Sequence, residues 1–234
     1  MIRAFERLLS RITGRGKRTI SFGDLRRVTP VSREFGFDRG APVDRRYIEG
    51  FLIRHAGDVR GRVLEVKDAA YSRRFGGNRV EVADVLDVDP TNPDATLIDD
   101  LTTGEHLPSD AFDCIVLTQT LHLIFDVHAA ARTLHRILKP GGVLLLTVPG
   151  ITQIPRSESS YWYWSFSSLA AERLFRGAFE GGTVDVASHG NVLAATAFLY
   201  GLAERELRAE ELDANDPDYP VTITVRAVKA PRTS

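Results

Sequence analysis

Polar side chains that could take part in catalysis follow an apolar run at residues 114–117. Thr118 and Gln119, which can donate and accept hydrogen bonds, come first, and His122 stands three positions further on. A histidine is the natural candidate for a general base, because its unperturbed pKa of about 6.5 lies near neutral pH. We therefore predict His122 as the base and His189 as the second candidate. A packing role is the alternative for His122.

The second feature that could take part in binding is a dense aromatic run at residues 161–166. Aromatic rings stack on the apolar faces of sugars and planar rings, so Tyr161 and Trp164 predict a ring-bearing ligand. The alternative is that the run only closes the hydrophobic core. The single cysteine, Cys114, lies within a predicted core strand, which excludes a disulfide framework and a cysteine metal site. We predict no bound metal.

Residues 35–56 carry more charge and aromatic surface than a structural loop requires. Pro42 and Asp44 mark the start of a helix within this segment. Arg39 and Tyr47 are predicted to contact a ligand. The alternative is a plain loop that is braced by salt bridges, which exposed pairs form at little cost.

A strand, a helix and a second strand hold the polar group around His122. The apolar runs 114–117 and 143–148 are typical of strands that are buried on both faces. The helix between them begins at Asp126, which can cap it, and shows an apolar stripe at residues 127–138. Residues 139–142, Lys-Pro-Gly-Gly, end it. Two buried strands that are joined by a covering helix must run parallel.

The other elements follow from the same patterns. Strands are predicted at residues 61–66, 80–85, 96–98, 183–187 and 219–228, the last of them alternating in polarity. Helices are predicted at residues 167–179 and 192–206, and His189 falls in the loop before the second of these. That loop should lie at the same edge of the sheet as His122.

Three motifs together resemble a known family. Phe112-Asp113 precedes a strand, Leu121-His122 lies near its end, and residues 138–142 read Leu-Lys-Pro-Gly-Gly before the next strand. This arrangement resembles the fourth and fifth strand region of class I S-adenosylmethionine-dependent methyltransferases. The resemblance implies an α/β fold with a doubly wound, seven-stranded, mostly parallel sheet, an antiparallel last strand and an N-terminal helical cap. It also implies S-adenosyl-L-methionine as the cofactor.

The first predicted strand departs from that family's pattern. An acidic residue, Glu65, stands where the family has one, but Lys67, Asp68 and Tyr71 lie in a turn that is normally rich in glycine. We count all four among the cofactor-binding residues. In a working variant of the turn, the Asp68 carboxylate or the Ser72 hydroxyl would contact the ammonium group of the cofactor.

Further cofactor contacts follow from the resemblance. Asp84 lies 19 positions after Glu65, close to the roughly 20 expected of an acid that binds ribose hydroxyls, with Asp87 or Asp89 as alternatives. Asp100 and Leu101 are expected to contact the adenine side of the cofactor, and Asp99 is the second choice for the acid. Thr118 and Gln119 are placed at the amino acid part of the cofactor.

Length and charge restrict the partners and the location that we expect for the protein. The chain of 234 residues has 30 basic and 31 acidic side chains, so its formal charge of −1 gives no field that attracts nucleic acid. No stretch of about 18 apolar residues and no signal-peptide pattern is present, so we expect a cytoplasmic protein without a membrane span. Residues 1–20 form a basic amphipathic segment that could dock on an acidic partner or membrane surface, or be a loosely packed terminal helix.

Residues 21–234 are expected to form the methyltransferase-like domain. By resemblance, residues 30–56 would be a cap or lid, and residues 155–180 and 188–215 would be additions over the pocket. The expected function is O-methylation of a small sugar or ring-bearing metabolite, and a homodimer is an expected assembly. Two alternatives stay open: a non-catalytic methyltransferase-like domain, or a lyase or cyclase that binds the same cofactor.

Overall fold

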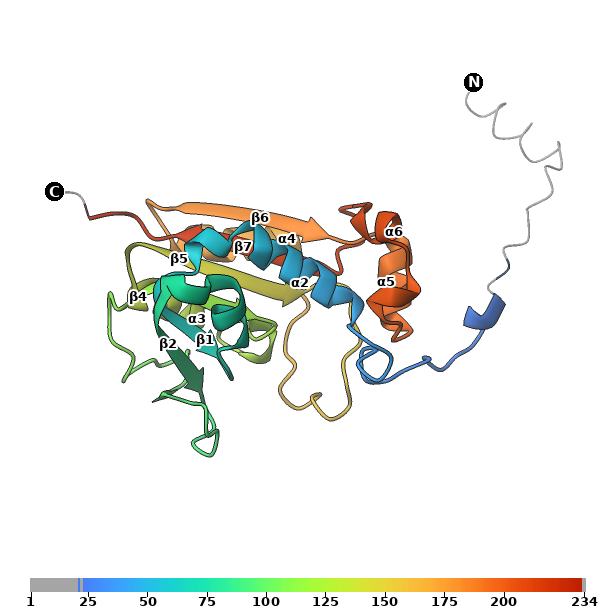
Figure 1. Cartoon of the computed structure of the whole chain (residues 1–234), viewed down its shortest axis with the longest axis horizontal. Coiled ribbons are helices and arrows are strands. Elements are labelled where there is room, and N and C mark those ends of the chain that lie inside the picture. The colour runs from blue at the N-terminus through green and yellow to red at the C-terminus, as the bar shows by residue number, and fades with distance from the viewer. Residues whose placement is uncertain (1–20, 22, 233–234) are drawn as a thin grey trace, which may run out of the picture.

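The computed structural model describes Ser21 and residues 23–232, so the predicted basic segment 1–20 lies outside the described residues. The described residues form a seven-stranded sheet in the order β3-β2-β1-β4-β5-β7-β6 (Figure 1). The strands are β1 (Gly61–Val66), β2 (Val80–Asp87), β3 (Leu97–Ile98), β4 (Phe112–Thr118), β5 (Leu138–Pro149), β6 (Thr183–His189) and β7 (Thr222–Val228). Strands β1 to β5 pair in parallel, and β7 runs antiparallel between β5 and β6. The predicted mixed sheet is confirmed.

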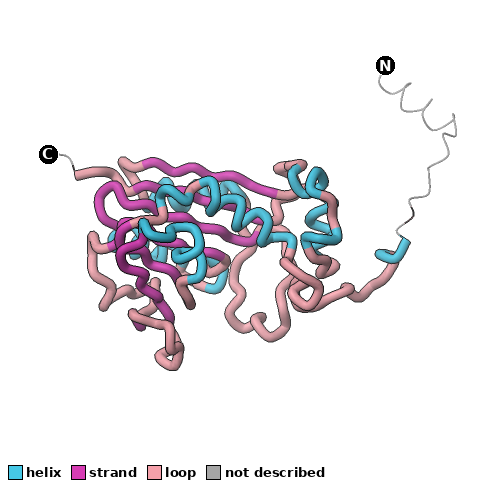
Figure 2. The backbone as a smooth tube through the Cα atoms, in the orientation of Figure 1, coloured by secondary structure: helices cyan, strands magenta, loops and turns pink. Residues whose placement is uncertain are grey.

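Helices cover both faces of this sheet (Figure 2). The α-helices are α2 (Val43–Arg54), α3 (Val127–Ile137), α4 (Ser168–Ala178), α5 (Val192–Leu199) and α6 (Ala209–Asp213). Short helical turns are η1 (Gly23–Leu25), η2 (Ala56–Asp58), η3 (Ser72–Gly76), η4 (Gly77–Arg79), η5 (Leu121–Leu123) and η6 (Glu204–Glu206). Among the described residues, none of these helices has the length and apolar character that a bilayer crossing requires.

Each face of the sheet has its own apolar core. Leu134 of α3 and Phe175 of α4 pack on one face, while Phe51 and Leu52 of α2 pack on the other against Val63 of β1. The first turn of α2 contacts α5 in a third cluster. This arrangement brings the N-terminal loop before α2 to the edge at which the parallel strands end (Figure 1).

The crossover helix follows its sequence signals. The Asp126 carboxylate accepts a hydrogen bond from the amide of Ala129 at 2.9 Å, which confirms the predicted cap. The helix ends at Ile137, and the chain is already extended at Leu138, where β5 begins. Gly141 has φ +79°, a conformation that suits a residue without Cβ.

Several element boundaries differ from the prediction, and those of β2 and β6 move site residues. Strand β2 runs to Asp87 because its parallel pairing with β1 continues to Leu86. Strand β6 runs to His189, which pairs with Thr222, so His189 lies in a strand and not in a loop. Helix α5 stops at Leu199, because Gly201 follows at φ +72° and packs against the backbone of Ser32, where a Cβ would lie 2.2 Å from the carbonyl oxygen.

Candidate active site

A cavity of about 1590 Å³ lies at the carboxyl ends of β1, β2 and β4. This is the place where the sheet order reverses between β1 and β4, and ligands bind in such a crevice in open α/β sheets. Its wall comprises Phe35, Phe37, Asp44, Arg45, Glu65, Val66, Lys67, Asp68, Ala70, Tyr71, Leu86, Asp87, Val88, Asp89, Asp99, Asp100, Leu101, Thr102, Thr118, Gln119, Thr120, His122, Leu123, Ile124, Phe125, Asp126, Pro149, Thr152, Glu158, Tyr161, Trp162, Tyr163, Phe198 and Val221.

The turn after β1 keeps the backbone shape that glycine would give it. Lys67 has φ +76°, a left-handed conformation that is costly for a residue with a side chain, and its side chain is exposed. Asp68 closes the turn, since its carboxylate accepts a hydrogen bond from the amide of Ala70 at 2.8 Å.

Glu65 anchors the short helix that follows this turn. Its buried carboxylate accepts hydrogen bonds from the amides of Tyr71 at 3.1 Å and Ser72 at 2.7 Å. Burial raises the pKa of Glu65, while the hydrogen bonds from Ser72 and Tyr71 oppose that shift. Glu65 lines the cavity, but its oxygens are already used to hold the turn.

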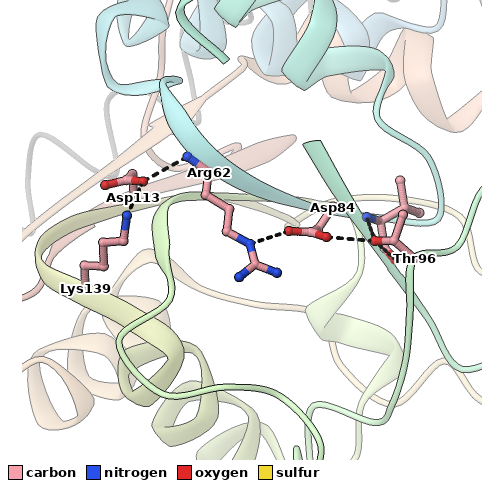
Figure 3. A network of polar contacts seen from close by, with 6 residues as sticks. Arg62, Asp84, Thr96, Asp113 and Lys139 are labelled. Carbon is pink, nitrogen blue, oxygen red and sulfur yellow. Dashed lines mark hydrogen bonds and ion pairs between the residues drawn. The ribbon is translucent and has the colours of Figure 1, made fainter. Parts of the chain in front are cut away.

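Asp84 does not line the cavity, which corrects the prediction that it binds ribose. Its carboxylate accepts hydrogen bonds from Arg62 Nε at 2.6 Å and Thr96 Oγ1 at 3.0 Å (Figure 3). The Arg62 backbone amide and the Lys139 ammonium group both donate to Asp113 in the same network. Asp84 is therefore a structural residue.

Asp87 is one of the two alternatives to Asp84 that the sequence offers. It is the last residue of β2 and lines the cavity. The side-chain amide of Asn92 donates to Asp87 Oδ2 at 2.6 Å, and the amide of Asp89 donates to Oδ1 at 3.0 Å. These bonds fix the orientation of the carboxylate at the end of the strand.

Asp99, Asp100 and Leu101 line the cavity after β3. Both oxygens of Asp99 accept backbone hydrogen bonds, from Asp100 at 2.8 Å and from His106 at 2.7 Å. Asp100 accepts one, from Thr102 at 2.7 Å through Oδ1. Asp100 thus keeps an oxygen for a ligand, which agrees with its rank above Asp99. Thr118 and Gln119 also line the cavity, and Gln119 has φ +46°.

His122 lies in the wall of the cavity and is 3% exposed. Its ring centroid is 4.2 Å from that of Trp162, and its Nδ1 has no hydrogen-bond partner among the described residues. Burial lowers the pKa of His122 to about 4, so the imidazole is neutral at pH 7. The ring is thus neutral, and its unpartnered Nδ1 is buried within the cavity wall.

The aromatic run is tied to the same histidine. The carbonyl oxygen of His122 accepts hydrogen bonds from the amides of Tyr163 at 3.0 Å and Trp164 at 3.3 Å. Tyr161, Trp162 and Tyr163 line the cavity. Trp164 does not, because its Nε1 donates to the Ile124 carbonyl at 3.0 Å and its ring stacks on Phe125. Trp162, and not the predicted Trp164, is therefore the tryptophan that lines the cavity.

Three other predicted residues lie outside the cavity. His189 has Nε2 3.2 Å from Thr224 Oγ1, and its ring stacks on Tyr47 with centroids 5.9 Å apart. Tyr47 is buried under α6, where its hydroxyl donates to the Leu212 carbonyl at 3.1 Å. Arg39 forms an ion pair with Glu206, which holds the pKa of that carboxyl at about 2. Geometry therefore gives no catalytic role to His189 and no substrate contact to Tyr47 or Arg39.

The sequence prediction left several cavity residues out of its site, although Asp44 and Arg45 belong to the charged segment that it considered for pocket contact. Asp44 and Arg45 come from the first turn of α2, Phe35 and Phe37 from the loop before it, and Phe125 from the loop before α3. The charge and aromatic content of residues 35–56 was the available signal. It did not separate Arg45, which faces the cavity, from Arg39, which braces the surface.

Comparison with known proteins places the chain in a family. A family model described as a methyltransferase domain matches residues 3–180, more than half of the chain. The chain belongs to this family and is an S-adenosylmethionine-dependent methyltransferase, with the class I fold predicted from its motifs.

Individual proteins resemble the chain either over a short stretch or at low sequence identity. The ubiquinone/menaquinone biosynthesis C-methyltransferase UbiE of Pectobacterium atrosepticum is 37% identical over 62 residues, a match that spans 26% of this chain and 25% of that protein. An S-adenosylmethionine-dependent methyltransferase from Mesorhizobium loti is 19% identical, with a TM-score of 0.54 over 81% of this chain and 99% of that one. The [4+2]-cyclase SpnF is 18% identical, with a TM-score of 0.54 over 80% of this chain and 81% of that one. The two structures share the fold.

The charge of the cavity suits this cofactor. Among the described residues that line it, nine carry carboxylates, while Arg45 and Lys67 are the basic ones. A sulfonium and an ammonium group are both cations, and such a surplus of negative charge stabilises them. The carboxylates of Asp87 and Asp100 end neighbouring strands and can accept hydrogen bonds from a nucleoside.

Proposed function

We propose that the protein transfers a methyl group from S-adenosylmethionine to a hydroxyl of a small, ring-bearing acceptor. The observation that carries the proposal is a single cavity with two kinds of wall. Carboxylates follow the ends of β1, β2 and β3, while His122 and Trp162 lie beyond the end of β4. The first part suits the cofactor, and the second suits an aromatic or sugar ring.

The following cavity residues then have proposed roles. Asp87 accepts hydrogen bonds from the ribose hydroxyls, and Asp100 with Leu101 contacts the adenine. Thr118 and Gln119 contact the amino acid part of the cofactor. The turn that contains Lys67, Asp68 and Tyr71 borders the same part, and Glu65 holds it in shape. Tyr161 and Trp162 contact the acceptor ring.

The cofactor supplies a methyl group on a sulfonium that is already a strong electrophile. The protein therefore has to align the acceptor and to accept one proton. His122 is neutral at pH 7 and has Nδ1 unpartnered among the described residues. Since its pKa of about 4 makes it a weak base, a phenolic hydroxyl, with a pKa of about 10, is a better partner than the less acidic hydroxyl of a sugar.

A product assay tests this function. Purified protein is incubated with S-adenosylmethionine and a panel of phenols and sugars, and S-adenosylhomocysteine and methylated product are measured by mass spectrometry. We expect His122→Ala to lower kcat by about 10² to 10⁴ with little change in cofactor affinity. His189→Ala is the matched control and should keep wild-type turnover, because His189 lies outside the cavity. Equal turnover of all three proteins excludes His122 as the base.

A lyase or cyclase that holds the cofactor as a static cation is the second candidate. The observation in its favour is the shared fold of SpnF, which is named as a [4+2]-cyclase. Product that forms without S-adenosylhomocysteine would support this candidate. Failure to bind S-adenosylmethionine at millimolar concentration would instead support a non-catalytic domain.

We also propose a cytoplasmic homodimer without a nucleic acid partner. The near-neutral charge of the chain supports the absence of a polyanion partner. Size-exclusion chromatography with light scattering tests the dimer, and cell fractionation tests the location.

A further inference from the structure

Arg45 is the one arginine among the described residues that line the cavity, and the only carboxylate whose pKa its charge lowers is that of the adjacent Asp44. Its Nη1 donates to the hydroxyl of Tyr71 at 2.9 Å, and its guanidinium lies 5.6 Å from the ring centroid of Phe37. Within residues 23–232 it forms no ion pair, although nine carboxylates line the same cavity. The neighbouring Asp44 also faces the cavity, and burial raises its pKa.

A guanidinium in this situation is oriented but not neutralised. It carries five N–H donors and stays charged at any physiological pH. The hydroxyl of Tyr71 and the ring of Phe37 are neutral partners, so they fix the plane of the group while leaving most of its donors to a ligand. The geometry that satisfies such a fork is a bidentate carboxylate.

The turn after β1 offers few alternatives for an anion. Backbone amides at a helix start usually bind one, but here the amide of Ala70 donates to Asp68, and those of Tyr71 and Ser72 donate to Glu65. The amide of Lys67 donates to the Leu86 carbonyl at 2.9 Å. Four amides of this turn therefore already have acceptors, and a side chain from another element can supply further donors to a carboxylate.

We propose that Arg45 is the carboxylate-binding residue of the cavity. This assignment rests on the proposed function. The hydrogen bond to Tyr71 ties Arg45 to the cofactor turn, so the amino acid carboxylate of the cofactor is one source of the anion. A carboxylate on the acceptor is the other source, because Arg45 also lies against the ring of Phe37, which lines the same cavity.

Two ligands that differ in one group test the first source. S-adenosylhomocysteine is titrated calorimetrically beside its decarboxylated analogue, 5′-(3-aminopropylthio)-5′-deoxyadenosine. We expect the wild type to bind S-adenosylhomocysteine about 10- to 100-fold more tightly, and Arg45→Gln to lose that preference by weakening only the carboxylate ligand. Arg45→Lys should recover part of it. Arg39→Gln removes an arginine of the same segment that lies outside the cavity and should keep the full preference.

The second source is tested with 4-hydroxybenzoate and 4-hydroxybenzamide, titrated in the presence of S-adenosylhomocysteine. A wild-type preference for the acid that disappears in Arg45→Gln assigns the carboxylate to the acceptor and supports the proposal. If Arg45→Gln keeps the wild-type discrimination in both ligand pairs, or if the wild type discriminates in neither, the proposal is overturned. Binding of the decarboxylated analogue by Arg45→Gln shows that the variant is folded. A wild type that binds neither nucleoside overturns the proposed function and this assignment together.

Discussion

The side-chain amide of Asn92 donates a hydrogen bond to the backbone carbonyl oxygen of Lys67 at 2.8 Å. The same nitrogen also donates to Asp87 Oδ2, at a donor–acceptor distance of 2.6 Å. One side chain therefore links the left-handed residue of the first turn to the carboxylate at the end of β2. Because Lys67 has φ +76° without being glycine, its conformation depends on such external contacts.

Removal of this link should weaken cofactor binding. We expect Asn92→Ala to reduce the affinity for S-adenosylhomocysteine by about 1 to 2 kcal/mol, since it frees both the Lys67 carbonyl and the Asp87 carboxylate. In a Lys67→Gly background the same change should cost less, because glycine adopts the turn without help. Calorimetric titration of the four proteins measures this coupling. Asn78→Ala, at an exposed asparagine of η4, is the matched control. Additive effects of the two substitutions would contradict the link.

Restoration of glycine at Lys67 should not destabilise the protein. A left-handed residue with a Cβ costs about 1 to 2 kcal/mol, whereas a new glycine costs about 0.5 to 1 kcal/mol in chain entropy. We expect Lys67→Gly to unfold at the same denaturant concentration as the wild type or a higher one, with equal or better cofactor affinity. Ala70→Gly, in the short helix that follows, should lose about 0.5 to 1 kcal/mol. A larger loss at Lys67 than at Ala70 would show that the turn is not strained.

The strand bounds explain which parts of the site the sequence could predict. Strand β1 matches its predicted range, because the apolar Val63, Leu64 and Val66 are followed by the polar Lys67 and Asp68. Strand β2 was expected to end at residue 85, whereas its pairing with β1 continues to Leu86 and its pairing with β3 continues to Asp87. Sequence spacing pointed to an acid near the end of β2, but only the register of the strands decides which acid reaches the cavity.

Substitution by alanine should therefore lower cofactor affinity at Asp87 and fold stability at Asp84. Asp87→Ala should weaken S-adenosylhomocysteine binding by about 1 to 3 kcal/mol, with little change in stability. Asp84→Ala should leave affinity unchanged but lower the free energy of unfolding by about 1 to 2 kcal/mol, because Arg62 and Thr96 lose their partner (Figure 3). Titration and urea unfolding of both variants measure the two effects. A loss of affinity at Asp84 with intact stability would restore the sequence-based assignment.

Long-range packing accounts for the remaining errors. The sequence gives no sign that Tyr47 and His189, 142 positions apart in the chain, stack beneath α6. Nor does it show that Arg39 meets Glu206 while Arg45 meets Tyr71. Both arginines fit the charge pattern equally well, and the tertiary partner of each decides whether it lines the cavity.

Protonation of His122 should destabilise the fold in mild acid. The pKa of this imidazole is about 4 in the folded protein, because burial disfavours its charged form, and about 6.5 when unfolded. Between these values the unfolded chain binds more protons, so stability falls as the pH drops through that window. For this group alone the loss between pH 7.5 and pH 5 is about 2 kcal/mol.

Urea unfolding of the wild type and of histidine variants at pH 7.5 and pH 5 measures this loss of stability. His122→Phe keeps a ring beside Trp162 but removes the titration, so its stability should fall less between pH 7.5 and pH 5 than that of the wild type. His189 also has its pKa lowered to about 4, so some pH dependence should persist in this variant and decrease further in the double variant with His189→Phe. His128→Phe, at an exposed position on α3, should follow the wild-type curve. Identical curves for the wild type and His122→Phe would mean that His122 is solvated in solution, which would make it a stronger base and remove the preference for an acidic hydroxyl.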